Sequence, residues 1–377
     1  MKHRSILLQI GVATHQRQRG IARFAREHGW HVMAEDRPSP PRGWRGDGAL
    51  VTLRDDPSLL RYVKRLLRDG VPVVDFSFCH PELQLPRVVG DHAAIGRLAA
   101  AHFAENRFSH AAWFSTGWTH VHNLRWEAFR AAWRGEPPAR LVWTDAVSPR
   151  RFDDWSALVA WLGRHLARLP KPLAVFAYND FDAVRILNAC SDNGFSVPEE
   201  IAILGVDDNR LVCENQTVTI SSIRHRLERI GYAGAALLER LMDGGAPPAA
   251  PIAVPPDGVV VRQSSDVLGV KDAFLRDVLD YIRGHLDRSF GIKGIAAHFG
   301  VSASTLARIF ATGLNTTVPQ EIARQRIARV KLLLANTEKP LAEIAAETGF
   351  CHAAHLSNAF RRHTGQSPGA YRAAAAD

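Results

Sequence analysis

Two copies of one pattern, near residues 292–311 and 341–364, constrain the fold of this sequence more than any other feature. In each copy a short apolar segment is followed by a glycine, Gly300 or Gly349, and then by a segment with apolar residues at helical spacing. Glycine adopts the left-handed backbone conformation that a tight turn between helices requires. Ser302, which starts the second helix of the first copy, is a residue type that caps helices. The pattern predicts two helix-turn-helix motifs.

The segment between the two motifs favours a single connecting helix. Residues 320–335 contain no proline or glycine, and their apolar side chains fall on one broad face. At 1.5 Å per residue such a helix is roughly 24 Å long. With one motif packed at each end, it can hold two DNA-reading helices about 34 Å apart, which is the length of one turn of DNA. An all-helical structural or partner-binding bundle is the alternative reading of the same pattern.

The second helix of each motif is the expected DNA-reading helix, and its side chains that face away from the core are the candidate DNA contacts. Arg308 suits a bidentate contact to guanine, and Asn358 suits adenine. The alternative is that both side chains meet only phosphate or solvent. We expect Arg324, Arg326 and three further arginines to contact phosphate. The candidate DNA-reading residues are Ser304, Thr305, Arg308, Ala353, Ala354, Ser357 and Asn358, and the remaining phosphate candidates are Arg329, Arg361 and Arg362.

The charge of the chain supports nucleic-acid binding by its C-terminal part. From residue 271 onward there are 14 lysines and arginines against 9 aspartates and glutamates, whereas the first 270 residues have 33 against 29. The net positive charge per residue is therefore about three times higher in the C-terminal part, as expected where affinity for DNA comes from phosphate neutralisation.

Before residue 271 short β-type runs alternate with helical segments, which is typical of β-α-β units and a parallel sheet. Such sheets bind ligands in crevices at the carboxyl ends of their strands. The sequence has no Gly-rich phosphate loop, nucleophile elbow or His-Glu-x-x-His zinc motif, so we expect no enzyme, no cofactor and no metal. The expected strands are 6–11, 48–53, 71–75, 87–90, 111–115, 173–177 and 201–206, and the expected helices are 20–28, 59–69, 95–105, 124–133 and 183–193.

Polar side chains gather just after several of the expected strands, where a crevice would lie. Carboxylates accept hydrogen bonds from hydroxyl groups, whereas arginine and asparagine donate them, so this set suits a polyhydroxylated ligand. Trp118 is the candidate for stacking on a sugar ring, with core packing as the alternative. For Asp91 the alternative is helix capping. The residues after the strands are Asp91, Arg125, Asn179 with Asp180, and Asp207 with Asp208.

The C-terminal motifs resemble the DNA-binding domain of the AraC/XylS family of transcription regulators. His355 and Leu356 stand where many members have Tyr-Phe; leucine still fills the core position, while the exposed chemistry at 355 is particular to this chain. The matching positions are Ile344-Ala345, Gly349-Phe350, Phe360, Gly365, Pro368 and Tyr371-Arg372.

The N-terminal part resembles the sensor of LacI/GalR regulators and periplasmic sugar-binding proteins, in which two α/β lobes close on a small molecule. The matching segments, in order, are 88–91, 125–129, 178–180 and 205–208. The resemblance implies that the ligand-binding residues are Asp91, Arg125, Asn179 and Asp207.

The order of the two resemblances is that of xylose-operon regulators. It implies an α/β two-lobed periplasmic-binding-protein-like sensor over residues 1–266, followed by an all-α DNA-binding domain with two helix-turn-helix motifs over 267–377. We therefore expect a cytoplasmic, homodimeric transcription activator that binds double-stranded DNA, contacts RNA polymerase and responds to a small carbohydrate, with D-xylose as one candidate.

Cysteine spacing and hydropathy fit this expectation. The four cysteines lie far apart without a Cys-x-x-Cys pair, which is typical of a reducing compartment. The apolar run at 6–13 is too short for a membrane span.

Two other classes of protein remain open on the sequence. One is a carbohydrate- or nucleotide-active enzyme fused to a DNA anchor, for which Asp207 and Asp208 are the nearest candidate pair. The other is a nucleoid protein that binds DNA without a ligand response.

Overall fold

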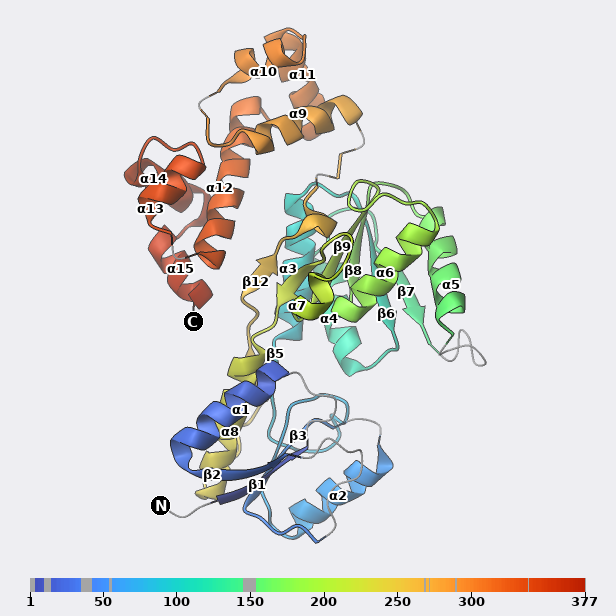
Figure 1. Cartoon of the computed structure of the whole chain (residues 1–377), viewed down its shortest axis with the longest axis vertical. Helices are drawn as coiled ribbons and strands as arrows, with labels where there is room; N and C mark the ends of the chain where they lie inside the picture. Colours follow the sequence, from blue (N-terminus) through green and yellow to red (C-terminus); the bar gives the residue numbers. More distant parts are fainter. Residues whose placement is uncertain are drawn as a thin grey trace.

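The computed structural model describes residues 4–9, 15–34, 43–53, 56–144, 154–267, 269–270, 272–288, 290–337 and 339–376 (Figure 1). It contains two α/β lobes and a C-terminal helical domain, which occupies the other end of the molecule from the first lobe. Within the described residues, no helix combines the length and the apolar character needed to cross a membrane.

The first lobe is a parallel sheet with helices on both faces. Its strand order is β2-β1-β3-β4, and a two-stranded unit of β11 and β5 adjoins it through a bridge between Asp75 and Arg87. Helices α1 and α8 pack closely at Gly20, because this residue has no side chain. A Cβ atom there would lie only 1.9 Å from the Glu228 carbonyl oxygen. The elements are β1 Arg4–Gln9, α1 His15–His28, β2 Trp30–Ala34, β3 Gly48–Val51, α2 Pro57–Arg68, β4 Val73–Asp75, β5 Val88–Gly90, α8 Leu227–Met242 and β11 Ile252–Val254.

The second lobe is a six-stranded sheet in the order β12-β10-β9-β8-β6-β7, parallel except for β12. One apolar cluster packs α5 and α6 against one face, and another packs α3 and α4 against the other. The elements are α3 His92–Glu105, β6 His110–Thr116, α4 His120–Ala132, β7 Ala139–Trp143, α5 Trp155–Arg168, β8 Leu173–Ala177, α6 Asp180–Asp192, β9 Ile201–Val206, α7 Arg210–Cys213, β10 Ser221–Arg224 and β12 Gly258–Val260.

The chain passes between the lobes three times, from β5 to α3, from β10 to α8 and from β11 to β12. His225, in the second crossing, lies against Gly90 in the first: a Cβ on Gly90 would come within 1.8 Å of its Nε2 atom. These crossings form the hinge of a two-lobed fold, and their close packing links the hinge to the first turn of α3.

The C-terminal domain consists of two helix-turn-helix units joined by α12. Each unit has its own apolar core, and α12 contributes to both. A short 3-10 helix, η1 Gln263–Ser265, precedes this domain. Its helices are α9 Ala273–Gly284, α10 Ile292–His298, α11 Ala303–Leu314, α12 Val318–Asn336, α13 Leu341–Glu347, α14 Ala353–Thr364 and α15 Pro368–Ala376.

The predicted fold class is confirmed, and the elements differ in detail. Helix α1 begins at His15, five residues before the expected helix over 20–28. Residues 10–13 of the first apolar run lie outside the described residues. Sequence reasoning did not identify β2, β7, β10, α5 and α8.

Candidate functional site

The two turns of the DNA-reading units adopt the predicted geometry. Gly300 has φ of 65° and Gly349 has φ of 69°, both in the left-handed region. The Ser302 hydroxyl accepts a hydrogen bond from the Thr305 amide at 3.0 Å, as a helix cap does. His352 caps α14 in the same way, because its Nδ1 atom accepts from the His355 amide at 3.1 Å.

The candidate DNA-reading side chains lie on the outer faces of α11 and α14. Leu306 and Phe310 are fully buried on the opposite face of α11, and Leu356 and Phe360 are fully buried on that of α14. Arg308 is exposed, and its guanidinium has no hydrogen bond or ion pair among the described residues. Of the predicted set, Ser304, Arg308, Ala354 and Asn358 are exposed, and Thr305, Ala353 and Ser357 are partly exposed.

The spacing of the two reading helices is set by α12, which has 19 residues and is about 28 Å long at 1.5 Å per residue. A capping box between Thr317 and Gln320 begins the helix. Helix α12 is therefore somewhat longer than the connecting helix that the sequence predicts, and its length is closer to the length of one turn of DNA.

Two of the arginines predicted to contact phosphate are engaged inside the protein. Arg326 donates to the Arg288 carbonyl at 2.7 Å and lies over the Phe350 ring, so it joins the two helix-turn-helix units. Arg324 donates to the Glu105 carbonyl of the sensor at 2.6 Å and pairs with Glu321 at 2.8 Å. The prediction is therefore wrong for both residues in this arrangement of the chain. Arg329, Arg361 and Arg362 are exposed, and the last two lie in the final turn of α14.

Arg125, one of the predicted ligand residues, is buried on α4. Its backbone carbonyl packs against Gly96 of α3, where a Cβ would come within 2.3 Å. The guanidinium donates to His92 Nδ1 at 3.3 Å and to the Tyr178 carbonyl at 2.5 Å, and it lies over the Tyr178 ring. Arg125 thus links the first turn of α3 to the end of β8.

Asp207 lies at the end of β9 in a strained backbone conformation. It has φ of 105° and the next residue, Asp208, has φ of 49°. Consecutive left-handed residues other than glycine cost free energy and are typical of functional sites. The turn is held by hydrogen bonds from the Asp207 amide to the Ile223 carbonyl and from the Asp208 amide to the Ser222 hydroxyl.

The two adjacent carboxylates have different partners. Asp208 is buried and pairs with Arg224 at 2.9 Å and with Arg262 at 2.7 Å. Asp207 is one-third exposed and lies 3.3 Å from His225 Nδ1. Because Asp208 is committed to two arginines, Asp207 is the carboxylate of this pair that is available to a ligand.

Two histidines that sequence reasoning missed connect Asp207 to Arg125. His225 contacts Asp207, the rings of His225 and His92 are 5.9 Å apart, and His92 accepts from Arg125. Burial, followed by the charge of Arg125, lowers the pKa of His92 well below its usual value. Burial also lowers the pKa of His225, in spite of the neighbouring Asp207. Both rings are therefore neutral near neutral pH, and each has a nitrogen able to bond a hydroxyl group.

The first lobe contributes an aromatic ring to this group. Phe78, which follows β4, is in edge contact with His92 and His120. The rings of His122 and Tyr178 stack at 3.7 Å on the side of the second lobe. The structure thus brings residues of both lobes and of the hinge together around Arg125 and His92.

The remaining predicted ligand residues have local roles in the fold. Asp91 caps α3 by accepting from the Ala94 amide at 2.8 Å, and Asn179 caps α6 by accepting from the Asp182 amide at 2.9 Å. Trp118 packs against Trp113, and the Arg140 guanidinium lies 5.0 Å from its ring. Tyr178, and not Trp118, is the aromatic residue in contact with Arg125.

Asp180 stabilises the strained turn at Asp207 and Asp208. Its carboxylate accepts from the Ser222 hydroxyl at 2.6 Å and from the Asn209 amide at 2.7 Å. Burial, followed by the charge of Asp207, raises the pKa of Asp180 to about 8. The side chain is therefore largely protonated at neutral pH.

This raised pKa predicts a pH dependence of stability. The folded protein holds the Asp180 proton more tightly than the unfolded chain, whose carboxyl has its ordinary pKa of 3.8, so the free energy of unfolding falls as the pH rises from about 4 to about 8. In Asp180→Asn the side chain is neutral at every pH. We expect its melting temperature to decline less than that of the wild type between about pH 5 and about pH 8. Melting curves at the two pH values test this, and equal declines would contradict it.

Comparisons with known families agree with this architecture. Residues 100–265 match the periplasmic binding protein-like domain family, and residues 295–374 match a helix-turn-helix domain family. The xylose operon regulatory protein of Haemophilus influenzae is 25% identical over 86% of this chain and 84% of its own length. That of Escherichia coli K12 is 24% identical over 98% of this chain and 97% of its own. The arabinose operon regulatory protein of Salmonella typhimurium is 37% identical over 27% of this chain and 37% of its own length.

Solved structures show the same fold. A xylose-binding transcription activator has a TM-score of 0.61 and 23% identity, covering 99% of this chain and 98% of its own. A LacI family regulator from Mycobacterium smegmatis has a TM-score of 0.55 and 22% identity over 69% of this chain and 98% of its own. The chain therefore joins a periplasmic-binding-protein-like sensor domain to a C-terminal helix-turn-helix domain, the architecture of a DNA-binding transcription regulator, and over its full length it is similar to xylose operon regulatory proteins.

Proposed function

We propose that this regulator responds to a small carbohydrate held between its two lobes, with Arg125 and Asp207 as the principal contacts. The observation that carries the proposal is the continuous line from Asp207 through His225 and His92 to Arg125. This line runs along the hinge, so a molecule that bonds to it also favours one relative position of the lobes.

The chemistry of this group suits a polyol. Asp207 accepts hydrogen bonds from hydroxyl groups, while Arg125 donates through a planar guanidinium that fixes the orientation of its partner. The neutral rings of His92 and His225 add a donor and an acceptor without adding charge. Phe78 and Tyr178 supply apolar walls of the kind that sugar rings pack against. Asp91 and Asn179 have an oxygen committed to capping, so their proposed ligand contacts use their other polar atoms.

The names of the full-length relatives support D-xylose as the first candidate. By the same analogy we propose that the protein is a cytoplasmic homodimer that activates transcription through contact with RNA polymerase. A ligand shifts the active population only by its difference in affinity between the open and closed forms, and about 1.4 kcal/mol of difference corresponds to a tenfold shift.

For DNA, we propose that α11 and α14 read successive major grooves. Arg308 and Asn358 are the proposed base contacts because both are exposed at the outer face of a reading helix. Arg329, Arg361 and Arg362 remain the proposed phosphate contacts.

A thermal-shift screen of the purified protein against pentoses, hexoses, sugar acids and polyols tests the carbohydrate proposal. A ligand that binds only the folded state raises its melting temperature by an amount that grows with the ligand concentration. We expect one sugar to raise it by several degrees and to lose this effect in Asp207→Asn. A flat response across the panel would contradict a free sugar as the effector and would leave the DNA-binding assignment standing.

A further inference from the structure

The linker between the two domains runs along the C-terminal end of α3. Val267 packs into the core of the second lobe. The Gly269 amide donates to the Asn106 carbonyl at 2.8 Å, and a Cβ on Gly269 would come within 2.6 Å of the Phe108 ring. His102 of α3 also bonds to the Ser265 hydroxyl at 2.8 Å. The DNA-binding domain is thus tethered beside the end of this one helix.

Arg107, just after α3, reaches across to α12. It has φ of 63°, a conformation that costs free energy for a residue other than glycine. Its guanidinium pairs with Glu321 at 2.5 Å and donates to the Leu314 carbonyl at 3.3 Å. Leu314 ends the first reading helix and Glu321 lies in the first turns of α12, so one side chain contacts both elements.

Glu321 is the buried centre of this contact. Its side chain is fully buried, and it also accepts from Arg324 at 2.8 Å and from Gln325 at 3.0 Å. Burial opposes ionisation, but the hydrogen bonds from Arg324 and Gln325 and the charges of Arg324 and Arg107 outweigh it and lower the pKa of Glu321 to about 2. The carboxylate is therefore ionised throughout the physiological range.

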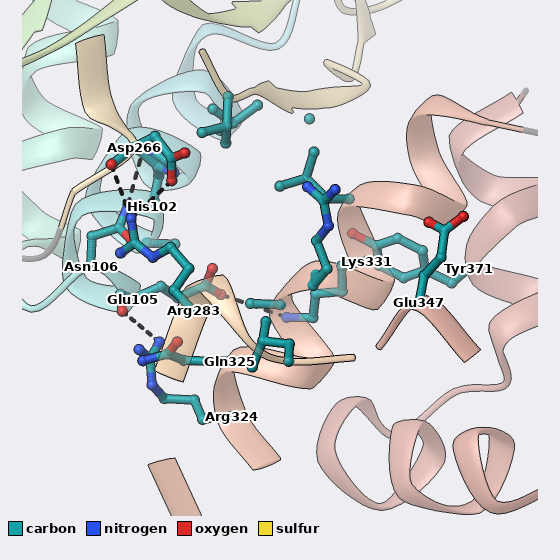
Figure 2. A pocket seen from close by; sticks show the side chains of 18 of the residues that line it. His102, Glu105, Asn106, Asp266, Arg283, Arg324, Gln325, Lys331, Glu347 and Tyr371 are labelled. Atoms are coloured by element: carbon teal, nitrogen blue, oxygen red, sulfur yellow. Dashed lines mark hydrogen bonds and ion pairs between the residues drawn. The ribbon is translucent and has the colours of Figure 1, made fainter. Parts of the chain in front are cut away.

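Further polar contacts surround the ion pair of Arg107 and Glu321. Glu105 accepts from Arg324 through its carbonyl at 2.6 Å, and its carboxylate lies 3.6 Å from Lys331. Arg283 of α9 pairs with Asp266 of the linker at 3.0 Å. Figure 2 shows these side chains converging from α3, the linker, α9 and α12.

Within the part of the chain that the structure describes, the two domains are not joined by a shared apolar core. Among the described residues, each apolar cluster belongs either to the sensor with its linker or to the DNA-binding domain. A cavity of about 680 Å³, lined from the sensor by Leu98 and His102 and from α12 by Gln325 and Lys331, lies between the domains (Figure 2). An interface made of charged contacts around a cavity is weaker and more sensitive to salt than a packed core.

We propose that the end of α3 is an ionic latch, formed by Glu105 and Arg107 of the sensor and by Glu321, Arg324 and Lys331 of α12, that holds the DNA-binding domain against the second lobe. Helix α3 starts at Asp91 and His92 in the effector site and ends at the latch, about 21 Å away at 1.5 Å per residue. The latch is therefore the place where the sensor acts on the spacing and orientation of the two reading helices. The latch is argued from the contacts between the two domains. Only the identification of a sugar as the signal that moves α3 rests on the proposed function.

The chain allows a direct test that needs neither effector nor operator. All nine tryptophans lie before residue 162, so they are donors confined to the sensor, while Cys351 is an exposed thiol in the DNA-binding domain. With Cys79 replaced by serine in every protein, a fluorescent acceptor on Cys351 reports the separation of the domains by energy transfer from tryptophan.

We expect strong transfer at low salt in the otherwise wild-type protein and a decrease as NaCl is raised to about 1 M, where the screening length falls to about 3 Å, because the exposed pair of Glu105 and Lys331 is screened more strongly than the buried Glu321. Arg107→Gln should lack that transfer already at low salt and should respond little to NaCl. Arg130→Gln removes the same charge from an exposed pair with Glu127 on α4 and should behave as the wild type. Circular dichroism establishes that each variant is folded.

A charge exchange provides a second test that does not depend on Arg107. Glu105→Lys and Lys331→Glu should each lower the transfer, and the double variant should restore it. Any one of three results would overturn the latch. The energy transfer could be independent of salt in the wild type, it could be unchanged in Arg107→Gln, or it could fall in Arg130→Gln as much as in Arg107→Gln. None of these results bears on whether a sugar binds, so this test and the thermal-shift screen fail separately.

Discussion

Arg125→Ala is expected to abolish the response of DNA binding to the effector and to leave the affinity for DNA without effector unchanged. The side chain is buried in the sensor, where it holds His92 and the Tyr178 carbonyl. A charged hydrogen bond contributes about 1.5–3 kcal/mol, so loss of a bidentate contact to the ligand predicts at least about a hundredfold weaker effector binding. Arg125 contacts no described residue of the DNA-binding domain.

Calorimetric titration of the sugar identified by the screen measures the first effect, and fluorescence anisotropy with labelled DNA measures the second. Arg130→Ala, on the exposed face of the same helix, is the matched control and should retain both activities. Arg125→Lys keeps the charge without the planar donor pair and should bind the sugar more weakly than the wild type. Loss of DNA binding in folded Arg125→Ala would contradict the separation of the two functions.

Arg308→Ala is expected to cost about 1–3 kcal/mol at the specific DNA site and much less on random DNA. Arg308 lies exposed on the outer face of α11, and its guanidinium has no hydrogen bond or ion pair among the described residues, so the substitution leaves the fold intact. The physical reason is that a guanidinium reads guanine through two parallel hydrogen bonds that other base pairs do not offer.

Competition binding with specific and random duplexes at fixed salt measures this difference. Arg361→Ala is the comparison, because a phosphate contact should lose affinity equally on both duplexes. An equal loss on both duplexes for Arg308→Ala would show that Arg308 contacts phosphate and would remove it from the reading set.

The sequence was most informative where a local rule determines the geometry. Gly300, Gly349 and Ser302 are found in the conformations predicted for them, because the conformations of left-handed turns and helix caps are determined largely by neighbouring residues. Buried apolar strands such as β8 and β9 were identified for a similar reason, since a continuous apolar run has few other uses.

The elements that were missed depend on distant partners. Strand β10 begins with two serines, which a sequence pattern assigns to a loop. In the structure Ser221 bonds to the Arg262 carbonyl and Ser222 bonds to Asp180, so both are buried and satisfied. Because β10 was not identified, His225 at its end was not recognised as a residue of the candidate site.

The errors in side-chain role have the same origin. Arg324 and Arg326 were expected at phosphates because an arginine on a helix between two reading units is typical of a DNA contact. Their partners, Glu105 and Arg288, lie 219 and 38 residues away in sequence, and no local pattern indicates that these residues meet. His92 and Arg125 are likewise 33 residues apart.

The most direct test of the whole account is the affinity for selected DNA with and without the sugar that raises the melting temperature. Duplexes enriched from random DNA by the full-length protein supply the binding site, and anisotropy titrations at one salt concentration supply both dissociation constants. We expect the sugar to change the affinity for the selected duplex at least about fivefold, with an equal reciprocal effect of DNA on sugar affinity. Equal dissociation constants in the two titrations would contradict an effector-responsive regulator.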